Sequence, residues 1–283
     1  MKDLTNRVAV ITGAASGIGR GSALALARAG ANLMLADIDV AGADGTARRA
    51  RDLGVAAEAA HCDVGQPDAM SKLRDAAIAR FGGVDLIMNN VGVLTSGRPE
   101  DIPVSEWERV LNLNLMSVVR SHAAFLPGFL ERGEGHIVNI ASFAALFPYS
   151  YDRTPYAASK AAIVSLTEGL ALYLRPKGIG VTLFCPGPVA TNIGASIKRW
   201  GAPLGIRGPG ARYKMITADE AGDMVVAAVR ESRFIGFSDP QVREPMMERA
   251  ADWEGFVTRQ ADEIAASESY AGASAENTLG KQP

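Results

Sequence analysis

Short runs of apolar residues alternate with longer segments of helical periodicity over most of this 283-residue chain. The short runs are continuous and do not alternate with polar residues, which is typical of strands covered by helices on both faces. Strands that alternate with helices indicate βαβ units, and such units build a parallel sheet. The sequence therefore predicts an α/β protein with a doubly wound parallel sheet. The predicted strands span residues 8–12, 32–37, 56–62, 85–89, 136–140 and 180–184.

End signals locate the main helices. Residues 105–108 and 217–220 have the Ser/Thr-x-x-Glu spacing of a capping box, which pairs the free N–H groups at the start of a helix. Gly30 is a typical C-terminal stop for the helix that precedes it. The predicted helices span residues 18–29, 105–129, 156–174 and 218–230.

The length is that of one large domain, and we expect residues 1–266 to form it with a C-terminal helical extension. Residues 192–214 are rich in Gly and Pro and are expected to form a substrate lid, with a plain surface loop as the alternative. An apolar stripe predicts a helix over 241–266 that buries one face in the core or against a second subunit. The small, polar residues 267–283 are expected to be disordered.

Composition argues against several classes of function. A net charge of −2 gives no electrostatic reason to expect nucleic acid or an anionic membrane as a partner. Cys62 and Cys185 form no spacing pattern, and the three histidines are scattered, so no metal site is expected. We expect no signal peptide, because a strand-like run begins at Arg7, and no apolar stretch is long enough to span a bilayer. The cytoplasm is the expected compartment.

A glycine loop joins the first predicted strand to the first helix. In this context Gly13 permits a tight turn, Gly17 lets the backbone approach a pyrophosphate, and Gly19 allows close packing of helix on strand. The start of the helix, at Ser16 and Ile18, offers free N–H groups and a positive dipole end to phosphates. The loop predicts a dinucleotide site, with an ordinary strand–helix turn as the alternative.

Asp37 ends the second predicted strand, eighteen residues after Gly19. A carboxylate at this place is expected to bind the ribose hydroxyls of adenosine and to repel a 2′-phosphate. The next residues, Ile38 and Asp39, supply no cation that could neutralise it. We therefore expect NAD and not NADP as cofactor, with a solvated strand end as the alternative for Asp37.

Tyr156 and Lys160 lie four residues apart on a predicted helix and therefore share one face. A nearby ammonium favours the phenolate, so we expect Lys160 to lower the pKa of Tyr156 and make it a usable acid/base. Such a pair alone is more often a surface feature, and the glycine loop upstream makes catalysis the better interpretation. Ser142 follows the carboxyl end of a predicted strand and is expected to orient the substrate oxygen, with a strand-end hydrogen bond as the alternative.

With these residues together, the chain resembles the short-chain dehydrogenase/reductase family in its compact, single-domain, NAD-dependent form. The resemblance implies a Rossmann fold and hydride transfer between NAD(H) and a secondary alcohol or ketone. It runs from about Arg7 to Thr191 and depends on several motifs in order. They are residues 12–19, 63–64, 89–92, Asn114, Ser142, Tyr156 with Lys160, and residues 186–191.

The resemblance implies four catalytic residues. Ser142 would bind the substrate oxygen, and Tyr156 would exchange its proton. Lys160 would bind the nicotinamide ribose, and Asn114 would support a water that links Lys160 to solvent. For Asn114 the alternative is a buried residue that caps a backbone group.

The resemblance also implies a cofactor-binding set that starts at the glycine loop and ends beside the nicotinamide. Asp63 and Val64 would contact the adenine. The full set is Gly13, Ser16, Gly17, Ile18, Gly19, Asp37, Asp63, Val64, Asn90, Tyr156, Lys160, Pro186, Val189 and Thr191.

The chain departs from the family pattern in four places. Val91 replaces a common Ala, and Ala141 replaces a common Ser. The segment from Ser142 to Tyr156 is about one residue longer than is common, so we expect an unusual loop at 147–153. The late strand of the family is expected to be absent, because residues 233–240 and a long extension stand in its place. This puts one tetramer contact of the family in doubt, whereas dimerisation through helices at 105–129 and 156–175 remains expected. The expected assembly is a homodimer or homotetramer.

The residues expected on the substrate side suit an apolar secondary alcohol or ketone, including an aromatic one, with core packing as the alternative. The region from Phe234 onward is also similar to that of bacterial dehydrogenases that act on aromatic carbinols of lignin-type compounds. An epimerase or dehydratase with bound NAD and a non-catalytic NAD-binding regulatory protein remain alternatives. The expected lining residues are Phe143, Leu146, Phe147, Pro148, Tyr149, Tyr151, Ile193 and Trp200.

Overall fold

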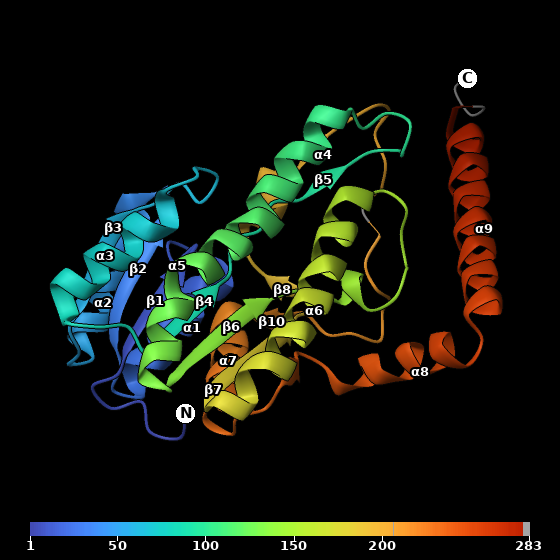
Figure 1. The fold of residues 1–283 in the computed structure, drawn as a ribbon. Helices are drawn as coiled ribbons and strands as arrows, with labels where there is room; N and C mark the ends of the chain where they lie inside the picture. Colours follow the sequence, from blue (N-terminus) through green and yellow to red (C-terminus); the bar gives the residue numbers. More distant parts are fainter. Residues whose placement is uncertain (206, 280–283) are drawn as a thin grey trace.

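The computed structural model describes residues 1–205 and 207–279, without the side chains of residues 195, 196 and 268–279 (Figure 1). Its centre is a seven-stranded parallel sheet in the order β11-β7-β6-β4-β1-β2-β3. The sheet confirms the predicted doubly wound α/β fold, because the strand order reverses between β1 and β4. The strands are β1 (Val8–Thr12), β2 (Asn32–Asp37), β3 (Ala57–His61), β4 (Leu86–Asn89), β6 (Gly135–Ile140), β7 (Ile179–Cys185) and β11 (Ile235–Phe237).

The predicted strands agree with the observed ones to within one residue at each end. The expected absence of a late strand was wrong. Residues Ile235–Phe237 pair in parallel with Leu183–Cys185 of β7 and form the edge of the sheet. A three-residue edge strand needs only one paired neighbour, so it carries no long apolar run that the sequence could display.

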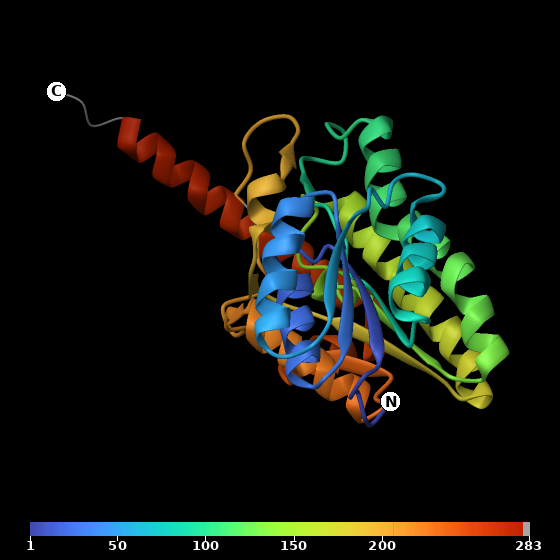
Figure 2. The same cartoon turned by 90° about the vertical axis from the view of Figure 1, so that its left-hand side faces the viewer.

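Helices cover both faces of the sheet (Figures 1 and 2). Alternate strand residues point to opposite faces, so Ala9 and Ile11 pack in one apolar cluster and Val10 in another. The first cluster includes α1 (Gly17–Arg28), α2 (Val40–Asp52) and α7 (Ala218–Arg230), and the second includes α3 (Ala69–Phe81), α5 (Ser117–Arg132) and α6 (Thr154–Leu174).

The two predicted capping boxes had different outcomes. Thr217 Oγ1 accepts from the Glu220 N–H at 3.1 Å, and the Glu220 carboxylate accepts from the Thr217 N–H at 2.7 Å, which confirms the box of α7. The box at 105–108 was wrong, because α4 (Val104–Leu111) begins earlier with Pro103 as its N-cap. Proline fixes the extended-to-helical entry two residues before Ser105, which therefore lies inside the first turn.

The Gly- and Pro-rich segment over 192–214, called here the lid, is attached at both ends. Within it β9 (Lys198–Arg199) pairs with β5 (Thr95–Ser96), and the Trp200 N–H donates to the Ser96 carbonyl at 2.9 Å. Next to its ends, β10 (Ile216–Thr217) pairs with β8 (Val189–Ala190). These short pairings hold the segment over the carboxyl ends of the sheet strands.

The C-terminal extension consists of two helices, where the sequence predicted one over 241–266. Helix α8 (Arg243–Ala251) ends at Asp252, whose carboxylate accepts from the Gly255 N–H and starts α9 (Trp253–Leu279). The break changes the helical phase, so Trp253 is 60% exposed while Phe256 is buried. Figure 2 shows α9 leaving the body of the molecule. Residues 280–283 of the tail expected to be disordered lie outside the described part, and that expectation stays a prediction.

Helices α1 and α7 touch through their backbones. A Cβ on Gly21 would lie 2.0 Å from the Ala218 carbonyl oxygen, and one on Gly222 would lie 2.3 Å from the Gly21 carbonyl carbon. No side chain larger than hydrogen fits at either position, so the two helices pack at the closest possible distance. None of the described helices combines the length and apolar character that a bilayer crossing requires.

Candidate active site

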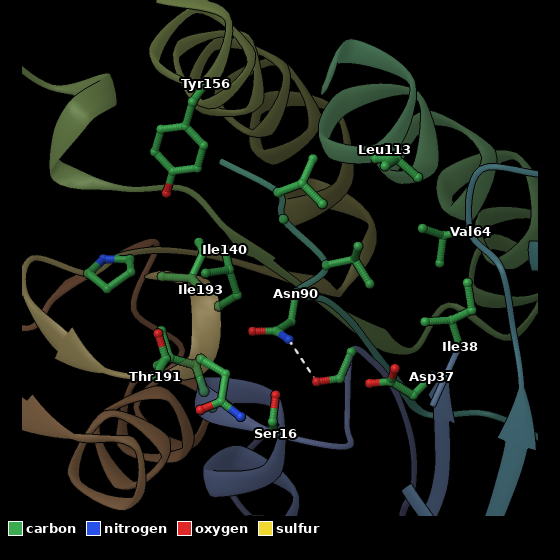
Figure 3. Close-up of a pocket in the computed structure, with 18 of the residues that line it drawn as sticks. Ser16, Asp37, Ile38, Val64, Asn90, Leu113, Ile140, Tyr156, Thr191 and Ile193 are labelled. Carbon is green, nitrogen blue, oxygen red and sulfur yellow. Dashed lines mark hydrogen bonds between the residues drawn. The ribbon is translucent and has the colours of Figure 1, made fainter. Parts of the chain in front are cut away.

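A cavity of about 470 Å³ lies at the carboxyl ends of the parallel strands (Figure 3). It spans the point where the strand order reverses, between β1 and β4, which is where open α/β sheets bind ligands. The predicted site residues that line it are Gly13, Ser16, Gly17, Ile18, Asp37, Asp63, Val64, Asn90, Tyr156, Lys160, Pro186 and Thr191.

Asn114, Ser142, Gly19 and Val189 were predicted for the site but do not line the cavity. Gly19 packs directly against the Gly13 carbonyl of the glycine loop. Val189, in β8, packs against the apolar core. The sequence interpretation also missed residues that directly follow a strand or face the loop after β4. Adjacency to the carboxyl end of a strand was the signal that could have found most of them. They are Ile38, Cys62, Gly92, Val93, Leu113, Ile140, Ala141 and Asn192.

The glycine loop has the backbone that the sequence predicted. Gly13 and Gly17 adopt positive φ angles of 68° and 54°, which side chains rarely tolerate. A Cβ on Gly19 would lie 2.0 Å from the Gly13 carbonyl oxygen. Asn90 clamps this turn, because its Nδ2 donates to the Thr12 and Gly13 carbonyls at 3.0 and 3.2 Å. The loop is therefore held rigidly at the mouth of the cavity.

The start of α1 is open to an anion. Ser16 is its N-cap but forms no side-chain capping hydrogen bond, and the first turn contains no acidic residue. The first N–H groups of a helix have no partner within the helix, and they carry the positive end of its dipole. Such a helix start is a typical binding place for a phosphate or pyrophosphate.

Asp37 lies at the far end of the cavity, beside the 67% exposed Ile38 (Figure 3). Its Oδ2 accepts from the Ala15 N–H at 2.9 Å, and its Oδ1 accepts from the Asp39 N–H at 3.0 Å. These two bonds fix the carboxylate between the glycine loop and the end of β2. Each oxygen keeps a further lone pair for the hydroxyls of a ribose.

Lys160 lies at the opposite end, where its Nζ donates to the Ile140 carbonyl at 2.8 Å. The ammonium lies 5.8 Å from the centroid of the Tyr156 ring, so both groups face the same end of the cavity. Burial lowers the pKa of Lys160 to about 8, because the charged ammonium is removed from water. A Cβ on Gly92 would lie 3.2 Å from Nζ, so glycine leaves room for this side chain.

Tyr156 points its hydroxyl into the cavity (Figure 3). Burial raises the pKa of Tyr156 above its usual value, while the Ser142 hydroxyl and the Arg153 guanidinium act to lower it. The expectation that Lys160 lowers the pKa of Tyr156 is therefore not met in this structure. Desolvation is the larger effect, and the ammonium is engaged with the Ile140 carbonyl.

Ser142 and Asn114 support this end of the cavity. Ser142 is buried at the end of β6, and its Oγ accepts from the Ala144 N–H at 3.2 Å. Asn114 lies in a π-helical turn between α4 and α5, Asn112–Met116, and is fully buried. Its amide pairs with both the N–H and the carbonyl of Val93 at 2.8 and 3.1 Å and donates to Ser159 Oγ. The structure thus shows the backbone-capping role that the sequence left open for Asn114.

Most of the expected substrate-lining residues lie elsewhere. Phe143 is fully buried, and its ring meets that of Tyr213 edge to face at 5.2 Å. Leu146 and Phe147 belong to the same apolar cluster, so the alternative of core packing is correct for these three residues. A 3₁₀ turn over Phe143–Ala145 directs the side chains inward, which the sequence did not indicate. Of the expected residues, Ile193 lines the cavity.

Among the described residues, no group of three or more His, Cys, Asp and Glu side chains could hold a metal ion.

Comparison with known proteins agrees with this geometry. The family model described as short chain dehydrogenase matches residues 7–202. The chain is 35% identical over 246 residues to the 1-deoxy-11-beta-hydroxypentalenate dehydrogenase of Streptomyces exfoliatus. This alignment covers 85% of the chain and 86% of that protein. It is also 35% identical over 240 residues to the "probable oxidoreductase EphD" of Mycobacterium tuberculosis, but spans only 39% of that longer protein.

A solved structure shows the same fold with a nucleotide bound. The short-chain dehydrogenase/reductase of Burkholderia phymatum in complex with NAD superimposes with a TM-score of 0.81 at 32% identity, over 90% of this chain and 96% of that one. The chain therefore belongs to the short-chain dehydrogenase/reductase family.

Proposed function

We propose that this protein is an NAD-dependent dehydrogenase that transfers a hydride between NAD(H) and a secondary alcohol or ketone, with Tyr156 as the acid/base. One observation carries the proposal. A single cavity has a pyrophosphate cradle and the carboxylate of Asp37 at one end, and the Tyr156 phenol with the Lys160 ammonium at the other. An extended dinucleotide bound across this cavity would have its reactive ring beside Tyr156.

NAD fits the adenosine end better than NADP. The Asp37 carboxylate is fixed by the Ala15 and Asp39 N–H groups and is free to accept from ribose hydroxyls. A 2′-phosphate at this place would face that carboxylate, and like charges at short distance are unfavourable. The neighbouring Ile38 provides no cation to compensate. Asp63 and Val64 line the same end and are proposed to contact the adenine.

The bound nicotinamide supplies the hydride acceptor or donor, and the protein supplies position and the proton. We assign the proton transfer to Tyr156, because its hydroxyl is the acidic group that points into the reactive end. Ser142 lies beside it and is proposed to orient the substrate oxygen. Lys160 is proposed to bind the nicotinamide ribose, and Pro186 and Thr191 to hold the nicotinamide from the opposite wall.

The raised pKa of Tyr156 predicts that reduction and oxidation depend differently on pH. At neutral pH the phenol is protonated, so it is ready to donate a proton to a carbonyl oxygen during reduction. Oxidation needs the phenolate, so the oxidation rate should rise with pH.

The reactive end of the cavity favours a neutral, apolar substrate. Val93, Ala141 and Ile193 line it, whereas the acidic lining residues Asp37 and Asp63 lie at the adenosine end. Lys160, the basic lining residue, is already hydrogen-bonded to Ile140. Because we assign Lys160 to the nicotinamide ribose, none of the other described lining residues at this end offers a cation to a carboxylate or phosphate of a substrate.

We also propose that the protein is a cytoplasmic homodimer or homotetramer without a nucleic-acid or membrane partner. Large apolar side chains are exposed on helices α4, α5 and α6, where a second copy could cover them. Val104 is 73% exposed, Val119 37% and Leu172 82%. Their burial would supply the apolar contact that an obligate interface needs.

The experiment follows NADH formation from NAD over a panel of secondary alcohols, including aromatic carbinols. It compares the native protein with Tyr156→Phe and with the control Tyr173→Phe, an exposed tyrosine of the same helix. We expect turnover to be lost in Tyr156→Phe and retained in the control. NAD binding with no net turnover on the panel would instead favour an epimerase, a dehydratase or a non-catalytic regulatory role.

A further inference from the structure

A buried ion pair stands directly before the helix that carries Tyr156. Arg153 donates to both carboxylate oxygens of Asp152, from Nε at 2.7 Å and from Nη2 at 3.2 Å. Asp152 is 3% and Arg153 is 8% exposed. Two charges are costly to bury, and a bidentate pair between adjacent residues is a specific way to satisfy them.

The pair connects three segments that are distant in the sequence. Arg153 Nη2 donates to the carbonyl of Arg207 in the lid, and the Asp152 carbonyl accepts from the Gly97 N–H at 2.9 Å. Arg207 in turn donates through its own guanidinium to the Ile264 carbonyl of α9. The lid, the loop after β4 and the C-terminal helix are therefore all joined to the start of α6.

Arg153 also determines where α6 begins. It is the N-cap, and its carbonyl accepts the helical hydrogen bond from the Ala157 N–H at 3.0 Å. Tyr156 is the third residue of this helix. The ion pair and the phenol therefore lie in the same turn at the start of α6.

Several charged or titratable groups face Tyr156. They are Arg153 at the N-cap of α6, Lys160 in α6, Cys185 from β7, and Tyr149 from the preceding loop. The guanidinium of Arg153 acts to lower the pKa of Tyr156. Burial raises the pKa of the Cys185 thiol to about 12, so this thiol is neutral. Arginine stays charged at every working pH, unlike the buried ammonium of Lys160.

The geometry points to Arg153, held by Asp152, as a positioning residue for Tyr156 that also fastens the lid to the start of the catalytic helix. It acts in two ways. It places a permanent cation near the phenol, and its guanidinium holds the lid backbone at Arg207. The kinetic part of this inference rests on the proposed function, whereas the part that concerns the lid does not.

The kinetic test compares Arg153→Met and Arg153→Lys by pH profiles of kcat/KM for alcohol oxidation. We expect Arg153→Met to lose at least about tenfold at neutral pH and to need a higher pH for activity, because the phenolate has lost a cation. Arg153→Lys should restore the pH at which activity appears, because the adjacent Asp152 carboxylate favours the charged ammonium. The control is Arg74→Met, which removes the same adjacent Asp–Arg pairing at Asp75 and a similar bond to a backbone carbonyl.

The structural test uses limited trypsin digestion, because the lid contains five cleavage sites. We expect cleavage in the lid to become severalfold faster in Arg153→Met and Arg153→Lys, since neither side chain has the fork that reaches Asp152 and Arg207 together. Mass spectrometry of the fragments locates the cut, and titration with NAD verifies that the fold is intact. The sites are Lys198, Arg199, Arg207, Arg212 and Lys214.

Arg153→Met leaves the buried Asp152 carboxylate without a cation, which disfavours folding, so the double variant Asp152→Asn/Arg153→Met is measured as well. Native pH profiles and native lid cleavage in the double variant would overturn the inference. So would an equal pH shift in the Arg74→Met control. If the native protein shows no turnover, the proposed function fails while the digestion still decides whether Arg153 fastens the lid.

Discussion

The Lys160 ammonium donates to the carbonyl of Ile140 at 2.8 Å, which ties helix α6 to the last residue of strand β6. Lys160 is only 3% exposed, and no described carboxylate pairs with it. A hydrogen bond to a neutral carbonyl offsets only a small part of the free energy needed to remove an ammonium from water. The hydrogen bond therefore fixes the position of the ammonium, while burial lowers the pKa of Lys160.

This arrangement predicts how Lys160 affects stability with pH. The pKa of Lys160 is about 8 in the folded protein and 10.5 when unperturbed, so the unfolded chain binds more protons between these values. The free energy of unfolding therefore rises with pH in this window, by up to about 3 kcal/mol relative to Lys160→Met. Urea unfolding between pH 7 and pH 11 measures it. Parallel curves for native protein and Lys160→Met would contradict the prediction, and exposed Lys72→Met is the control.

A second prediction concerns the glycine loop. In Gly19→Ala the added Cβ would lie 2.0 Å from the Gly13 carbonyl oxygen, so the pyrophosphate cradle must open. We expect the affinity for NAD to fall by at least about tenfold, which is about 1.4 kcal/mol, and Tm to fall with it. Fluorescence titration and thermal unfolding measure the two effects.

Gly45→Ala is the matched control, since no atom lies within 4 Å of the added Cβ on helix α2. Alanine is the better helix former by about 1 kcal/mol, so this variant should be slightly more stable and bind NAD normally. Equal losses of affinity in both variants would show that the close contact of Gly19 is not the cause.

A third prediction concerns the choice of cofactor. Asp37→Ser removes the charge that we propose to face the ribose while keeping a hydroxyl to accept and donate hydrogen bonds. We expect the ratio of kcat/KM with NAD to that with NADP to fall at least about tenfold, since NADP is no longer repelled. The control Asp52→Ser, exposed at the end of α2, should keep the native ratio. Comparable efficiency of the native protein with both cofactors would contradict the role of Asp37.

A fourth prediction concerns acid. His122 is buried near Asn139, at 3.5 Å between Nε2 and Nδ2, and burial lowers its pKa from 6.5 to about 4. Below pH 6.5 the unfolded chain binds the proton first, so stability is lost as pH falls from 6.5 to 4. The loss should reach about 3 kcal/mol relative to His122→Leu. Denaturant unfolding at pH 7 and pH 4.5 measures it, with the exposed His61→Asn as a variant that should follow the native curve.

The fold was predictable because buried parallel strands appear in the sequence as uninterrupted apolar runs, and each of the six expected strands is present. The nucleotide end of the site was predictable for a similar reason, since Gly13, Gly17 and Asp37 have positions that local backbone geometry requires. These features depend on neighbours in the sequence.

The parts that were wrong depend on neighbours in space. Phe143 follows a strand end, as a substrate-lining residue should, but its ring packs against Tyr213, seventy residues later. The raised pKa of Tyr156 results from burial, which spacing from Lys160 cannot show. The start of α4 was decided by Pro103, although a better capping sequence begins at Ser105.

The contact of Gly21 with Ala218 and Gly222 restricts the motion of helix α7 relative to helix α1. Helix α1 starts at the pyrophosphate cradle, and α7 starts immediately after the lid, at the pairing of β10 with β8. Because their backbones are in contact, we expect α1 and α7 to move as one rigid unit, so that a displacement of α7 would also displace the glycine loop. We therefore expect any movement of the lid to occur between Thr191 and Ile216 and to leave the glycine loop in place.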